Sequence, residues 1–114
     1  MKEESTFGRA IAAARKKLNL SQKELAARIK KEEGGAITPQ YLNDIEHDRR
    51  SPSSDQMVRQ FADVLQINPD YLYYLAGRIP DDIRKKRLSE QAVATGMMAL
   101  RGAKAKVVTF GNLI

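Results

Sequence analysis

Polar and basic side chains gather between residues 38 and 50 of this 114-residue chain. Gln40 and Asn43 carry amides, and an amide that donates and accepts side by side matches the edge of an adenine. Asp44 offers a carboxylate, which can accept a hydrogen bond from the amino group of a cytosine. Arg49 and Arg50 follow closely, and guanidinium groups bind phosphates through charge and hydrogen bonds. Side chains of these types are able to contact a nucleic acid.

Catalytic and metal chemistry have little support in the residues. The chain has no cysteine and a single histidine, His47. A zinc site would need carboxylates for most of its ligands, and a Ser-His-Asp arrangement would depend on His47, which lies near no nucleophile elbow. The sequence also lacks the glycine patterns of P-loops and of dinucleotide-binding turns. We therefore expect no enzyme activity, no cofactor and no metal site.

Charge and length narrow the class of protein. The chain carries 20 Lys and Arg against 14 Asp and Glu, a net charge of +6, which favours a polyanionic partner: DNA, RNA or an anionic membrane surface. The length of 114 residues fits one compact domain plus an appendage, and the hydrophobic share of 42% is enough for a modest core. The sequence has no apolar run of about 18 residues and no apolar segment behind its first residues, so we expect a cytoplasmic protein without a membrane span or secretory signal.

Local signals predict three helices in the first half of the chain. The first runs from Thr6 to Leu18, with an apolar stripe at helical spacing. The stripe consists of Phe7, Ile11, Ala14 and Leu18. The second starts at Ser21, which forms a capping box with Glu24. The third starts at Thr38, with a proline in its first position, and turns its polar side chains outward.

Three more helices are predicted downstream. One follows a capping box of Ser53 and Gln56, the next covers residues 68–77, and the last covers about residues 89–101. Residues 107–110 are β-branched or aromatic and are strand-prone. Short helices with brief polar connections predict an all-α, orthogonal bundle that is stabilised by shared burial.

The order of these segments resembles a known family. The strings NLSQKELAARI, ITPQYLNDIE and RRSPSSDQMVRQFADVLQINPDYL are similar to the lambda-repressor/Cro-like, or XRE-type, helix-turn-helix transcriptional regulators. The resemblance covers about residues 6–77 and implies a five-helix lambda-repressor-like DNA-binding domain at residues 1–78. In such domains the third helix enters the major groove of double-stranded DNA. Residues 79–114 would then form a C-terminal helical tail with one additional helix.

The resemblance also implies roles for individual side chains. The family position that matches Gln22 contacts a phosphate at the start of the second helix, beside Ser21. The family's base-contacting positions correspond to Pro39, Gln40 and Asp44. The DNA-binding residues that we expect, with phosphate contacts from the last three, are Ser21, Gln22, Thr38, Gln40, Tyr41, Asn43, Asp44, His47, Arg49 and Arg50.

One structural pair follows the family pattern, and two features depart from it. Arg15 and Glu46 match an ion pair that fixes the third helix against the first. Residues 30–36 make the turn before the third helix much longer than in the family, so either the second helix gains a turn or a loop bulges toward the DNA backbone. Asp48 stands where a glycine often follows the third helix, and Asp tolerates the left-handed conformation better than most residues.

The residues assigned to DNA contact also have alternative, purely structural interpretations. Gln40, Asn43 and Asp44 can form a solvated helix face, and Tyr41 can belong to the core. The basic run at residues 84–87 is interpreted as a solvated helix face rather than as a second DNA contact.

The predicted last helix carries an apolar stripe at residues 93, 97 and 100, which needs a partner surface. The stripe either packs back on the domain or forms a dimer interface. We expect a homodimer built from the fifth and sixth predicted helices, because dimers of such proteins match the symmetry of palindromic operators. The predicted function is a sequence-specific transcriptional repressor that binds a palindromic operator as a dimer. The alternative is an antitoxin or adaptor protein of the same fold, whose main role is to bind a partner protein through the C-terminal tail.

Overall fold

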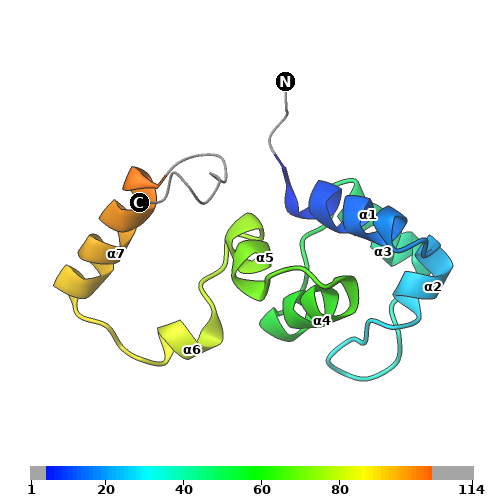
Figure 1. Cartoon of the computed structure of the whole chain (residues 1–114). Coiled ribbons are helices and arrows are strands. Elements are labelled where there is room, and N and C mark those ends of the chain that lie inside the picture. Colours follow the sequence, from blue (N-terminus) through cyan, green and yellow to red (C-terminus); the bar gives the residue numbers. More distant parts are fainter. Residues whose placement is uncertain (1–4, 104–114) are drawn as a thin grey trace. The chain divides into compact units, whose positions relative to one another are not determined.

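The computed structural model describes residues 5–103 (Figure 1). The chain falls into two units, with the boundary between Asp81 and Asp82. Its helices are α1 (Phe7–Lys17), α2 (Gln22–Ala26), α3 (Pro39–Glu46), α4 (Asp55–Leu65), α5 (Pro69–Leu75), α6 (Asp81–Arg84) and α7 (Glu90–Gly102). The predicted all-α fold, with a five-helix domain and an additional C-terminal helix, is confirmed. The short α6 was not predicted, and the strand-prone residues 107–110 lie outside the described residues.

Apolar side chains from α1 to α5 meet in one core in the first unit. Ile11, Leu42 and Phe61 are completely buried. The rings of Phe7 and Phe61 pack edge to face, with centroids 5.8 Å apart. The other core residues are Leu25, Ala26, Ile29, Ile37, Ile45, Met57, Val58, Ala62, Leu65, Leu72 and Tyr73. Helices of 5 to 11 residues are marginal in water, so this shared burial is what stabilises them.

The end of the predicted stripe on α1 differs in the structure. Leu18, the last residue of the predicted stripe, is exposed because α1 ends one residue earlier and Leu18 forms its C-cap. On α5 the buried aromatic residue is Tyr73, whose hydroxyl donates to the carbonyl of Asp55 over 3.2 Å. Tyr71 and Tyr74, on the same helix, are exposed.

Most helices begin at the predicted caps. The Thr6 and Thr38 hydroxyl oxygens accept hydrogen bonds from backbone N–H groups in the first turns of α1 and α3. The capping box of Ser21 and Glu24 is present in both directions at α2. Each of these caps depends on contacts over three residues, which is why the sequence predicts them well.

The start of α4 differs from the prediction. The expected capping box of Ser53 and Gln56 is wrong, since the helix begins at Asp55. Ser54 has the extended backbone of an N-cap residue, and its hydroxyl oxygen accepts from the N–H of Met57 over 3.1 Å. The third helical residue is therefore a methionine, which has no polar oxygen to complete a capping box.

The long turn between α2 and α3 folds as a small hairpin. Lys30 and Ala36 form an antiparallel bridge, and Gly34 and Gly35 turn the chain with φ values of 97° and 79°. Gln60 of α4 clamps the base of the hairpin: it accepts from the Lys30 N–H over 2.7 Å and donates to the Lys30 carbonyl over 3.0 Å. Of the two predicted alternatives, the structure contains the loop, and α2 is not prolonged.

Asp48 connects the end of α3 to the start of α1. Its φ of 60° is left-handed, as expected for a residue in place of glycine. One carboxylate oxygen accepts from the N–H of Gly8 over 3.0 Å, and the other accepts from the Thr6 hydroxyl over 2.7 Å. A carboxylate is favourable at the N-terminal end of a helix, so Asp48 acts as a second cap of α1.

Replacing Gly8 by alanine is expected to destabilise the first unit by about 1–3 kcal/mol. A Cβ atom there would lie closer than 3.0 Å to the carbonyl oxygens of Ile45 and Glu46, so α1 and the end of α3 would have to separate. Urea unfolding followed by far-UV circular dichroism measures the loss. Gly102→Ala is the control, because a Cβ at Gly102 meets nothing within 4 Å. Equal stability of the two variants would contradict the close approach.

The second unit contains α7, which begins after Ser89. The Ser89 hydroxyl oxygen accepts from the N–H of Ala92 over 3.1 Å and so caps the helix. None of the residues of α7 is buried. Among the described residues, no helix combines the length and apolar character that crossing a membrane requires.

Candidate nucleic-acid interface

Helix α3 divides its side chains between the core and the surface. Leu42 and Ile45 are completely buried, and α3 packs against α1 and α2. Gln40 is exposed, and Asn43 and Asp44 are half-buried on the outer side. The apolar spacing of three residues therefore fixes which polar residues are presented outward.

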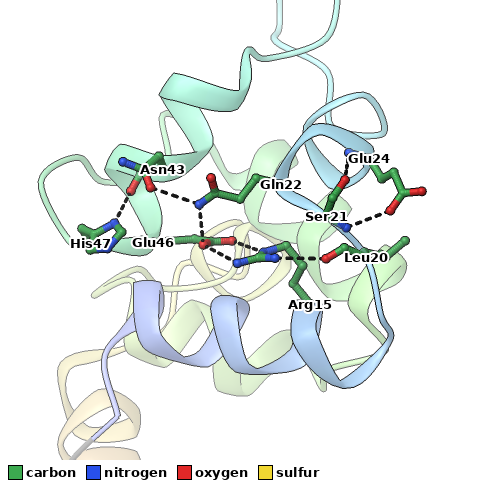
Figure 2. A network of polar contacts seen from close by, with 8 residues as sticks. All are labelled: Arg15, Leu20, Ser21, Gln22, Glu24, Asn43, Glu46 and His47. Carbon is green, nitrogen blue, oxygen red and sulfur yellow. Dashed lines mark hydrogen bonds and ion pairs between the residues drawn. The ribbon is translucent and has the colours of Figure 1, made fainter.

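An ion pair fixes the end of α3 against α1, as the resemblance implied (Figure 2). The Arg15 guanidinium donates from Nε to Glu46 Oε2 over 2.6 Å and from Nη2 to Oε1 over 3.0 Å. Its Nη1 donates to the Leu20 carbonyl over 3.0 Å. The side chains of Arg15 and Glu46 are only 11% and 3% exposed. This two-point contact sets both the position and the rotation of α3.

Gln22 extends this network to the outer face of α3 (Figure 2). Its amide nitrogen donates to Glu46 Oε1 over 2.8 Å and to Asn43 Oδ1 over 3.1 Å. His47 Nδ1 lies 2.9 Å from the Asn43 backbone carbonyl, which fits a proton on that nitrogen. The first residue of α2 is thus linked to a predicted base-reading residue, a contact that sequence analysis did not predict.

Ser21 is already engaged in the capping box. Its N–H donates to Glu24 Oε1 over 2.8 Å, and its hydroxyl oxygen accepts from the Glu24 N–H over 3.0 Å. The hydrogen bond from the Ser21 backbone, followed by that from its hydroxyl and by the charge of Arg28, lowers the pKa of Glu24 below its ordinary value of 4.5. Because α2 has only five residues, its dipole is small, and a phosphate here would depend on side chains.

Asp44 is shared by two other predicted site residues. Its Oδ1 accepts from the Gln40 amide over 3.0 Å and from Arg49 Nη2 over 3.4 Å. The Arg49 side chain is 56% exposed, and an ion pair this exposed contributes about 0–1 kcal/mol. Arg49 and Asp44 can therefore exchange their ion pair for contacts with a ligand at a small cost in free energy.

Tyr41 combines the two roles that the sequence left open. It is half-buried and packs against the core, while the guanidinium of Arg50 lies 4.4 Å from the centre of its ring. A cation over an aromatic face is attracted by the ring, so Tyr41 positions Arg50 at the surface after α3. The Thr38 oxygen accepts from the Tyr41 N–H over 3.0 Å as the helix cap.

Helix α1 contributes basic side chains that sequence analysis did not select. An open depression of about 520 Å³ lies between α1 and the end of α3. Its lining includes Arg9 and Lys16 from α1 together with the predicted residue His47. The sequence contained a signal for these basic side chains, because Arg9 and Lys16 are two helical turns apart and therefore share one face of α1. Among residues 5–103, no three His, Cys, Asp or Glu residues are grouped as metal ligands.

Comparison with known proteins identifies the family. The helix-turn-helix family matches residues 11–72, more than half of the chain, from α1 to α5. Searches of curated proteins and of solved structures gave no match. The matched segment contains α2, α3 and the network that joins them. The chain belongs to the XRE-type, lambda-repressor-like helix-turn-helix family, and it is a DNA-binding regulator.

Proposed function

We propose that this protein is a sequence-specific transcriptional repressor that binds a palindromic operator as a dimer. The observation that carries the proposal is the fixed presentation of α3. Arg15 and Gln22 hold the end of the helix through Glu46, and Gln22 also donates to Asn43 (Figure 2). Gln40, near the start of the helix, is exposed. A reading helix that is held this rigidly loses little conformational freedom on binding, which favours specific recognition.

The base edges are read by three side chains of α3. The Gln40 amide pairs with an adenine after exchanging its contact with Asp44. Asn43 keeps its oxygen on Gln22 and offers its NH2 group to a base acceptor. Asp44 accepts from the amino group of a cytosine. These contacts carry the sequence preference, since the grooves display the base pattern.

The phosphates are held by residues around α3. Arg49 and Arg50 lie directly after the helix, and Arg50 is supported by the Tyr41 ring. The other expected phosphate contacts come from Ser21, Gln22 and His47, whereas Thr38 lies beside the base-contacting positions. Such contacts position the protein on the duplex and carry little sequence information.

The apolar surface outside the core supports the proposed dimer. Tyr71 and Tyr74 of α5 are stacked with centroids 6.4 Å apart and are exposed, and α7 is exposed along its whole length. We assign both helices to contacts between two copies. A symmetric dimer would bind half-sites about 34–36 Å apart, and it would compete with other proteins for the promoter.

The experiment that tests this function is selection from a random duplex DNA library at two salt concentrations. Enrichment of an inverted repeat with half-sites one helical turn apart is expected. Binding that enriches no sequence and disappears at the higher salt concentration would be nonspecific charge attraction, and it would overturn the proposal.

Replacing Arg49 by alanine is expected to weaken binding to all sequences by a similar factor. Loss of one phosphate contact also lowers the slope of log K against log salt by about 1. Fluorescence anisotropy titrations at several salt concentrations, on operator and on unrelated duplexes, measure both effects. Lys86→Ala removes the same charge from the run interpreted as a solvated face, and it is the control. A loss confined to the operator would show that Arg49 reads bases instead.

A further inference from the structure

Helix α7 has one continuous apolar face. Successive residues of an α-helix are about 100° apart, and this spacing brings small and large apolar residues to one side. We define the α7 face as Ala92, Val93, Gly96, Met97, Ala99 and Leu100. Its three large side chains, at positions 93, 97 and 100, are 43%, 37% and 63% exposed. Gln91, Thr95 and Met98 lie on the opposite side.

We propose that the α7 face binds the α7 face of a second copy of this chain in an antiparallel pair. This inference deepens the proposed function, since it rests on the dimer included there. Charge determines the orientation: Glu90 and Arg101 lie at opposite ends of α7, along the same edge of the face. An antiparallel pair sets Glu90 beside Arg101 twice. A parallel pair would place the two copies of each charge at the same level on opposite edges of the interface, and it would form neither Glu90–Arg101 pair.

The sizes of the side chains fit the same register. With Glu90 opposite Arg101 of the second copy, Ala92 lies opposite Ala99, and Leu100 comes level with the small Ala92. Gly96 falls at the centre of the pair, and a Cβ there would meet nothing within 4 Å. Val93 comes nearly level with Met97 of the second copy, so their side chains pack together, and the small residues let the two backbones approach closely at the centre.

The size of the face sets the strength of the dimer. Thirteen residues give a helix about 20 Å long, so the pair buries less than about 1,200 Å², in the range of weak complexes. The dimer would therefore form at micromolar or higher concentrations in solution. Two half-sites on one operator would then hold both copies at a high effective concentration and strengthen the pairing.

Sedimentation equilibrium of the full chain tests the face. We expect a monomer–dimer equilibrium for the unaltered protein and at least a tenfold weaker association for Val93→Asp with Met97→Asp. Thr95→Asp with Met98→Asp is the matched control, because it places the same two charges on the opposite side of the helix, and it should not change the association. Equal association of all three proteins would overturn the inference. So would a monomer at every concentration, which would leave α7 for a different protein partner.

Single cysteines test the orientation, since the chain has none of its own. Under mild oxidation, Ala92→Cys mixed with Ala99→Cys should form a mixed disulfide dimer, because those positions lie within bonding reach. Leu100→Cys alone should not form one, since the two residues are about 13 Å apart along the helix axis. The reverse result would establish a parallel pair and overturn the inference.

Binding to a duplex with one half-site separates this inference from the proposed function. The aspartate variant of the α7 face should bind a single half-site as the unaltered chain does, and it should lose affinity only for the full operator. If the unaltered chain prefers no DNA sequence, the proposed function fails whichever result the cysteine variants give.

Discussion

Replacing Glu46 by alanine is expected to lower the free energy of unfolding by about 3–5 kcal/mol, because it leaves a largely buried charge without its partner. The Glu46 carboxylate accepts hydrogen bonds from Arg15 at two points and from Gln22 at a third. After the substitution, the Arg15 guanidinium keeps only the Leu20 carbonyl among the contacts of this network. Part of the folded population would also lose the fixed position of α3.

Urea unfolding followed by far-UV circular dichroism measures this change. Asp44→Ala is the control: it removes a carboxylate from the same helix, but from an exposed pair, and should cost about 1 kcal/mol or less. The double variant Arg15→Met with Glu46→Leu should be more stable than Glu46→Ala, because both charges are gone. If Glu46→Ala costs no more than Asp44→Ala, the network does not hold α3 in place.

Replacing Gln40 by alanine is expected to reduce affinity for the selected operator by about 5- to 150-fold per half-site, the value of one bidentate base contact. Gln40 is exposed near the start of α3, and its amide donates to the carboxylate of Asp44 on the next turn. The substitution removes no core contact, so stability should stay the same. Affinity for unrelated duplexes should change little.

Competition titrations with operators altered at each position measure the effect. The variant should lose its preference at one base pair and retain it at the others. Gln56→Ala, an exposed glutamine at the start of α4, is the matched control and should leave the preference unchanged. A uniform loss at every sequence would mean that Gln40 positions the protein through the phosphates and does not read a base.

The start of each major helix could be predicted from local patterns in most cases. Ser21 with Glu24, and Thr38 before a proline, act over three residues, and their geometry depends little on the rest of the chain. The apolar spacing of Leu42 and Ile45 likewise determined which side of α3 faces outward. The Arg15–Glu46 pair was predicted from the family resemblance alone and is confirmed.

Tertiary structure decided the contacts between residues that are distant in the chain. The choice between a longer α2 and a loop depended on Gln60, which clamps Lys30 from α4. Asp48 became a cap of α1, and Gln22 reached Asn43, only because three helices converge there. Hydrogen bonds of this kind need atoms within about 3 Å, and the distance between separate helices is set by core packing. The sequence by itself therefore determined the helices and the outward face of α3, whereas packing of the core decided how that face is held.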